Sequence, residues 1–248
     1  KKFFQKSFLF FLLMFLQLQS FSQQKTSWIS GRTTGKIPQL AYSLGNDRLG
    51  SSMMGYLDSD VLLKITDSTR NHYRVQLSAN HSAWIDKDNV KPDARTNKFN
   101  KPFLLNNWIA SGGNDGYDTL IMFMDEKLPY KSRMEINPAR IVITLFGVES
   151  NTNFIMQHIS TLKEIQNIDF DQTEDDVVQV TVELKHAQHW GYTLNYHDDT
   201  LMLLVKQAPG KNALSNFKIA IDAGHGGNNP GSRGNNMGLL EKTYTLIF

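Results

Sequence analysis

The sequence predicts a mainly β protein, with two successive β domains followed by the beginning of an α/β domain. Three observations carry this prediction. Short alternating apolar runs, separated by turn residues, fill the region from Ser27 to Asp93. Runs rich in β-branched and large apolar residues follow between residues 102 and 208. After residue 216 comes an apolar run, then a glycine-rich stretch, then apolar residues at helical spacing.

Composition supports packed domains and excludes several kinds of site. The chain has 248 residues, of which 40% are hydrophobic, and no cysteine. It therefore has no disulfide, no thiol nucleophile and no cysteine-ligated metal. The formal charge of +2 falls to about −1 without Lys1, Lys2 and Lys6, which leaves 23 basic against 24 acidic residues. A near-neutral chain without a basic block predicts no nucleic-acid partner.

Residues 1–22 have the layout of a secretory signal peptide. Three lysines precede an apolar run from Phe8 to Leu16, and polar residues follow. A stable membrane anchor is the alternative, but about nine apolar residues are too few for a bilayer core that needs about 20. Ser20 and Ser22 supply small side chains for cleavage after Ser22. We therefore expect an exported protein of the periplasm or cell envelope.

The first β domain is expected over residues 23–93, as a small barrel of strands about five residues long. The segments Leu44–Gly50, Gly55–Leu57 and Trp84–Ile85 resemble a bacterial SH3-like domain of envelope enzymes. The resemblance implies a module that binds wall polymers or neighbouring domains. Equally, these aromatic residues fill a small barrel, so no binding residue is assigned. The strand-like runs are Val61–Ile65, Tyr73–Leu77 and Ala83–Ile85.

The composition of the polar stretch Lys91–Lys101 predicts a linker. We place the linker itself at residues 94–101, after the end of the first domain at residue 93. The second β domain is expected over 102–208. Asp198-Asp199 predicts a hairpin turn between the last two strands. The strand-like runs are Thr119–Met124, Arg140–Phe146, Val177–Leu184 and Leu201–Val205.

The second β domain resembles AMIN-type domains in three stretches, Arg140–Gly147, Glu174–Trp190 and Thr200–Lys206. The resemblance implies a β-sandwich that holds cell-wall amidases on peptidoglycan. His186 and His189 have the His-x-x-His spacing of some metal sites. Residues three apart on a strand point to opposite faces, so we expect a packed or surface pair instead.

After a second linker, 209–216, residues 217–248 have the order strand, glycine-rich loop, helix. Phe217–Ile221 is the predicted strand, and Leu239–Ile247 the predicted helix start. Eleven of the thirteen residues from Gly226 to Gly238 are Gly, Asn, Pro or Ser, which predicts an irregular loop. The order places His225 just past the carboxyl end of a strand, where open α/β sheets have their sites.

The glycine-rich loop does not match a nucleotide-binding motif. No lysine follows the glycines at P-loop spacing, and Asn229 stands where a dinucleotide fingerprint needs its third glycine. His225 and Glu241 remain, an imidazole and a carboxylate that together offer two ligands of a zinc site. Two simpler interpretations stay open here. Glu241 could serve the positive end of the helix dipole, and His225 could be an ordinary loop residue.

The segment Ile219–Gly227, with Pro230-Gly231 and Leu240–Lys242, resembles the opening of the zinc-dependent N-acetylmuramoyl-L-alanine amidases, also named the amidase_3 family. In that family the matching histidine and glutamate bind zinc. The resemblance therefore implies Zn²⁺ as cofactor, with His225 and Glu241 as metal ligands. Ala223 stands where many relatives have proline, a change that we expect to be tolerated.

The resemblance also implies what the full-length enzyme does. It would cleave the amide between N-acetylmuramic acid and L-alanine in peptidoglycan, with an activator protein as a further conceivable partner. The family's second zinc histidine and catalytic glutamate lie beyond Phe248, so no catalytic residue is assigned, and the catalytic domain is incomplete as written. We expect the 248-residue chain to be inactive and to bind zinc weakly if at all. The alternative is a noncatalytic envelope protein that binds peptidoglycan through its two β domains.

Overall fold

The computed structural model confirms a mainly β protein. The predicted signal peptide 1–22, the segment 46–50 and much of the first linker lie outside the described residues. By its contacts the chain divides into two compact units, one ending at Ala208 and one beginning at Pro209. The structure describes residues 28–45, 51–93, 98–99, 101–113, 115–151, 155–209, 218, 220–235, 237–245 and 247.

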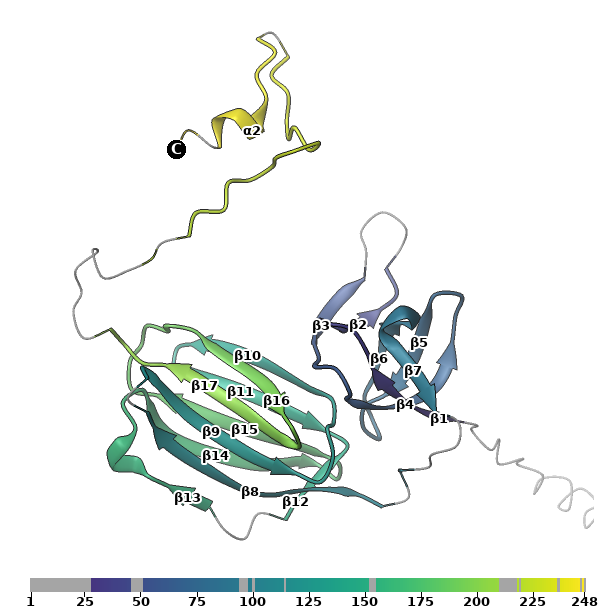
Figure 1. The fold of residues 1–248 in the computed structure, drawn as a ribbon, viewed down its shortest axis with the longest axis vertical. Coiled ribbons are helices and arrows are strands. Elements are labelled where there is room, and N and C mark those ends of the chain that lie inside the picture. Colours follow the sequence, from purple (N-terminus) through teal and green to yellow (C-terminus); the bar gives the residue numbers. More distant parts are fainter. Residues whose placement is uncertain are drawn as a thin grey trace, which may run out of the picture. The chain divides into compact units, whose positions relative to one another are not determined.

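The first β domain, from Trp28 to Asp93, is one strongly curved antiparallel sheet (Figure 1). Its order is β3-β2-β6-β5-β4-β1-β7. A 3-10 turn, η1 (Lys87–Asn89), links the last two strands, and the Asp86 carboxylate accepts from the Asp88 amide there. The strands are β1 (Ile29–Thr33), β2 (Gln39–Ser43), β3 (Ser52–Tyr56), β4 (Leu62–Ser68), β5 (His72–Gln76), β6 (Ser82–Asp86) and β7 (Val90–Asp93).

Alternation along the strands builds the core of this domain, because successive side chains of a strand face opposite sides. In β6, Ala83 and Ile85 are buried while their neighbours are more exposed. Residues 91–93 of the polar stretch form part of β7 and pair with β1, inside the first domain as bounded at residue 93. Lys91 and Asp93 are exposed, as suits an edge strand, so their polar composition hid the strand.

The second β domain packs two sheets face to face (Figure 1). One sheet has the order β10-β11-β15-β14, and the other β12-β8-β9-β17-β16, with β13 parallel to β8. A 3-10 turn, η2 (Ile159–Thr161), precedes β14. The strands are β8 (Phe103–Gly112), β9 (Tyr117–Met124), β10 (Tyr130–Ile136), β11 (Ala139–Phe146), β12 (Val148–Ser150), β13 (Ile155–Gln157), β14 (Ile165–Glu174), β15 (Val177–Leu184), β16 (Tyr192–His197) and β17 (Thr200–Lys206).

The core of the sandwich lies between its sheets. Trp108 of β8 is fully buried and meets the Phe170 ring of β14 edge to face at 5.1 Å. The predicted hairpin at Asp198-Asp199 is confirmed, because β16 and β17 pair from His197 and Thr200 outwards. Asp198 adopts a φ of 48°, a left-handed conformation that aspartate tolerates in turns.

The two β domains are docked to each other by polar contacts on two sides. On one side, the Arg32 guanidinium of β1 donates to both carboxylate oxygens of Glu126, at 3.1 and 2.9 Å. On the other side, His81 Nε2 lies 2.7 Å from Glu174 Oε1. Lys98 of the linker adds a 2.8 Å contact to Glu126. The domains are therefore held as one body within the first unit.

The second unit contains one short helix, α2 (Glu241–Tyr244), among its described residues. The predicted helix Leu239–Ile247 is thus shorter at both ends, although its start is correctly located to within two residues. Lys218, Ala220 and Ile221 belong to no strand, and Ile221 is exposed. The predicted strand is wrong at these positions, because a strand needs a hydrogen-bonded neighbour and no described segment pairs with them. Phe217 and Ile219 of that strand, with residues 210–216 of the predicted second linker, lie outside the described residues.

No helix among the described residues is long and apolar enough to cross a bilayer.

Candidate metal centre

The structure brings His225 and Glu241 together. The Nε2 atom of His225 lies 3.3 Å from Oε2 of Glu241, and both side chains are partly exposed. Glu241 is the first residue of α2, and His225 lies on the loop before it. One nitrogen and one oxygen donor therefore face the same small volume at a solvent-accessible position.

Backbone pairing holds the loop in shape. The predicted irregular loop contains two isolated antiparallel bridges, Gly226 with Asn229 and Arg233 with Leu240. The amide of Glu241 also donates to the Ser232 carbonyl at 3.0 Å. The chain therefore folds back on itself before α2, which returns Glu241 to the neighbourhood of His225. Sequence composition predicted the fold-back but not the bridges.

Gly231 has no side chain, so it leaves space in which the side chains of His225 and Glu241 meet. Its φ is +68°, and a Cβ atom there would lie 2.7 Å from Cδ2 of His225 and 2.8 Å from Oε2 of Glu241. Only glycine combines this left-handed conformation with that lack of volume. His225 itself has a φ of 67°, an uncommon value for a residue with a side chain. Such local strain is characteristic of functional sites.

Glu241 is held as an anion. The Ser232 amide donates to its Oε2 atom at 2.8 Å. This backbone hydrogen bond, with further contributions from the Ser232 side chain and from the charge of His225, holds the pKa of Glu241 below its ordinary value. A carboxylate that stays ionised is a competent metal ligand. Ser232 therefore contacts the candidate site, which sequence reasoning missed because the 2.8 Å contact is made by a backbone amide.

Two further contacts tie α2 to the glycine-rich loop. The Thr245 hydroxyl donates to the Gly224 carbonyl at 2.6 Å, and Lys242 Nζ donates to the Gly227 carbonyl at 3.0 Å. These bonds cross the loop on either side of His225 and limit its movement relative to Glu241. The Lys242 of the Leu240–Lys242 stretch thus has a structural role that its sequence position alone did not reveal.

The donor set fits a zinc ion in kind. Zinc takes imidazole nitrogen and carboxylate oxygen, and Gly231 keeps the space between the two donors clear. Among the residues that the structure describes, no group of three histidine or acidic side chains forms a complete metal site. His225 and Glu241 are therefore two candidate ligands that the structure brings together.

His186 and His189 have separate protein partners. His186 Nδ1 lies 2.7 Å from Glu164 Oε2, and His189 Nε2 lies 2.7 Å from the Glu135 carbonyl. Both residues follow the end of β15, so the strand geometry assumed in their interpretation does not apply. Each imidazole instead serves a local contact.

Comparison with known proteins returns one family. No curated protein matches the chain, and no solved structure does. One family model, that of the AMIN domain, matches part of the chain. This match begins in β8 and ends in β17, so it covers nearly all of the sandwich, and it confirms the resemblance drawn from the sequence of this domain. AMIN domains are typical of periplasmic proteins and are associated with peptidoglycan binding. Residues 109–205 match the model of the AMIN domain.

Proposed function

We propose that this chain is part of an exported zinc-dependent N-acetylmuramoyl-L-alanine amidase, which acts on peptidoglycan in the cell envelope. The observation that carries the proposal is the 3.3 Å approach of His225 Nε2 to Glu241 Oε2. These residues stand at the histidine and glutamate of the motif that resembles the amidases. The AMIN match of residues 109–205 supports the same polymer as the target.

The residues of this chain have defined parts in such a site. His225 and Glu241 would hold the metal, and a bound zinc ion would supply Lewis-acid polarisation of the scissile amide between N-acetylmuramic acid and L-alanine. The Ser232 amide keeps Glu241 deprotonated and fixes the direction of its Oε2 atom. Gly231 keeps bulk out of the space between the ligands.

Metal binding by the chain tests the assignment of the ligands. Zinc affinity is measured by competition with a chromogenic chelator for the wild-type chain, His225→Ala and Glu241→Ala. We expect each substitution to weaken zinc at least about tenfold, because a ligand bond is lost. His197→Ala is the matched control, since His197 is exposed on β16 and far along the chain from the loop. Unchanged zinc affinity in His225→Ala contradicts the assignment.

The amidase activity is tested on the protein together with the coding sequence that follows Phe248. A histidine and a glutamate downstream, in an α/β pattern, support the enzyme. Release of stem peptides from purified sacculi should then depend on His225. A His225→Ala protein that releases peptides at the wild-type rate would disprove the proposed reaction.

A noncatalytic wall-binding protein is the second candidate. It is favoured by the AMIN match and by the docking of the two β domains into one compact unit. In this case the chain pellets with sacculi and His225→Ala has no phenotype in the cell. A loss of function in that variant, with sacculus binding intact, would exclude the noncatalytic protein.

A further inference from the structure

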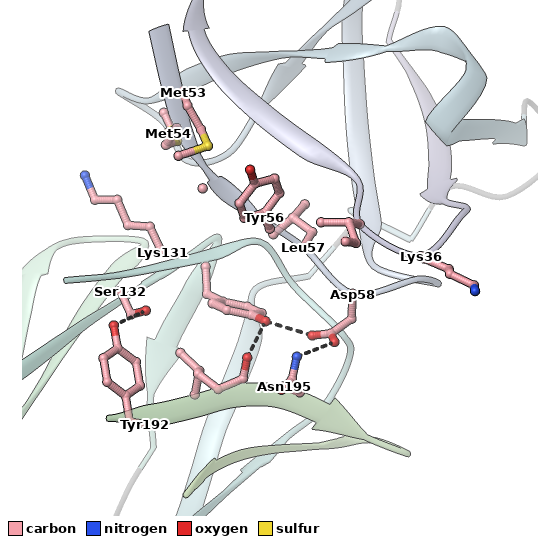
Figure 2. Close-up of a pocket in the computed structure, with 14 residues that line it drawn as sticks. Lys36, Met53, Met54, Tyr56, Leu57, Asp58, Lys131, Ser132, Tyr192 and Asn195 are labelled. Atoms are coloured by element: carbon pink, nitrogen blue, oxygen red, sulfur yellow. Dashed lines mark hydrogen bonds between the residues drawn. The ribbon is translucent and has the colours of Figure 1, made fainter. Parts of the chain in front are cut away.

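A groove of about 430 Å³ lies where the two β domains meet. Three strands border it, and each is the end strand of its sheet, namely β3 of the first domain and β10 and β16 of the sandwich. Figure 2 shows Met53 and Tyr56 on one wall, with Lys131 and Tyr192 on the facing one. The groove therefore exists only because the domains are docked.

The floor of the groove is a network of hydrogen bonds between protein groups. Asp58 accepts from the Tyr130 hydroxyl at 2.8 Å, from Asn195 Nδ2 at 3.2 Å and from the Tyr196 amide at 3.0 Å. The Ser132 and Tyr192 hydroxyl groups bond to each other at 2.9 Å (Figure 2). Since Asp58 is already satisfied by three donors, it offers little to a ligand, and the floor acts as a rigid support.

The walls carry exposed apolar side chains. Met53 and Tyr56 have about half of their surface accessible, at 51% and 52%, and Ile37 has 64%. Tyr42, on the neighbouring strand β2, is 52% exposed. Solitary exposed apolar residues need no explanation, but a group lining one groove marks a binding surface. The aromatic rings offer flat faces against which the C–H face of a sugar can pack.

The charge available in the groove is positive. Lys131 Nζ lies 5.8 Å from the centre of the Tyr42 ring, where it makes a cation–π contact at the groove edge. Lys36 lines the opposite end. The ion pairs of the described residues involve other cations, so neither ammonium group is paired with a carboxylate there. Two cations fall far short of a nucleic-acid surface, which neutralises many phosphates, but they suit a ligand with isolated carboxylates.

We infer that this interdomain groove binds a peptidoglycan strand, with sugar rings against Tyr56 and Met53 and a stem-peptide carboxylate on Lys131. The inference rests on the proposed function and adds to it a binding site that both β domains build. Peptidoglycan combines sugar C–H faces with carboxylates at intervals, which is the combination that these walls complement. Binding there also requires the first domain to stay docked on the sandwich.

Pelleting with purified sacculi tests the inference on the full chain. We expect Lys131→Glu and Tyr56→Ala each to weaken the apparent Kd about tenfold, the effect of losing a contact worth about 1.4 kcal/mol. Lys163→Glu and Ile159→Ala are the matched controls, because both residues are exposed and lie outside the groove. The controls should bind as the wild type does. All four variants should keep the wild-type melting temperature.

The outcomes separate the groove from the proposed function. Wild-type chain that does not pellet overturns both. Wild-type chain that pellets, with Lys131→Glu and Tyr56→Ala within twofold of it, overturns the groove alone. Sacculi stripped of stem peptides give a second measurement. On them the difference between wild type and Lys131→Glu should vanish, and a persistent tenfold difference would overturn the assignment of Lys131 to the peptide carboxylate.

Discussion

The Asp58 carboxylate of the first β domain accepts a hydrogen bond from the Tyr130 hydroxyl of the sandwich, with an oxygen–oxygen distance of 2.8 Å. Burial of Tyr130, together with the nearby negative charge of Asp58, raises the pKa of its hydroxyl above the ordinary value. The hydroxyl therefore remains a neutral donor throughout the physiological range. This contact joins the two domains at the groove between them.

Replacing Asp58 should loosen the docking of the domains. Asp58→Ala leaves the Tyr196 amide and the Asn195 side chain without their acceptor, which should lower the free energy of unfolding by about 2 kcal/mol. Urea denaturation measures the change. Asp88→Ala, at an exposed position of the same domain, should shift stability by less than about 0.5 kcal/mol. Equal stability of the two variants would show that Asp58 does not fasten the domains.

Asp118 should be the most sensitive acidic residue of the sandwich. It is fully buried, and its carboxylate accepts from the backbone amides of Lys163–Ile165 and from Gln207 Nε2. Asp118→Ala leaves several hydrogen-bond donors without an acceptor. It should lower the free energy of unfolding, measured by heat or urea, by about 3 kcal/mol or more. The exposed Asp171→Ala serves as the control. A loss below 1 kcal/mol in Asp118→Ala would mean that water replaces the carboxylate.

Gly231 should support metal binding without being a ligand. Gly231→Ala places a methyl group against His225 and Glu241 and forces a left-handed backbone on alanine. We expect zinc affinity to fall about tenfold or more. Gly234→Ala is the matched control, because its added Cβ would meet only ordinary contacts, the nearest at 3.5 Å. Equal zinc affinity in the two variants would contradict the role given to Gly231.

Acid should weaken the contact between the domains at Glu174. Hydrogen bonds from Asn80 and then His81 hold the pKa of Glu174 below its ordinary value of 4.5. The unfolded chain therefore binds this proton more readily than the folded one, so the stabilisation is present above the ordinary pKa and is lost as pH falls through the lowered one. Urea midpoints measured from pH 3 to 7 should decline less steeply in Glu174→Gln. Parallel curves for the two proteins would refute the linkage.

The strands that the sequence predicted are mostly interior ones, and those that it missed lie largely at sheet edges. β15 alternates between buried and half-buried residues, and its bounds matched the prediction, Val177–Leu184. β10 and β14 went unpredicted, since edge strands carry polar side chains on their open side and give no clear apolar period. Periodicity reports burial, and a strand that is half exposed gives a weak signal.

The residues of the candidate site also divide into those that the sequence identified and those that it missed. His225 and Glu241 were identified from the sequence because a short motif carries them. Ser232 and Gly231 were not assigned roles, because one acts through its backbone amide and the other through missing volume. Neither contribution leaves a recognisable mark on residue type.

The sequence by itself determined the mainly β class, the hairpin at Asp198-Asp199 and the identity of the two metal-ligand candidates. These depend on alternation, turn chemistry and spacing, all of which act within a few residues. The tertiary structure alone decided that Asp58 meets Tyr130 and that β3, β10 and β16 border one groove. Such meetings join segments far apart in the chain, and they depend on the free energy of packing whole sheets together, which no local pattern encodes.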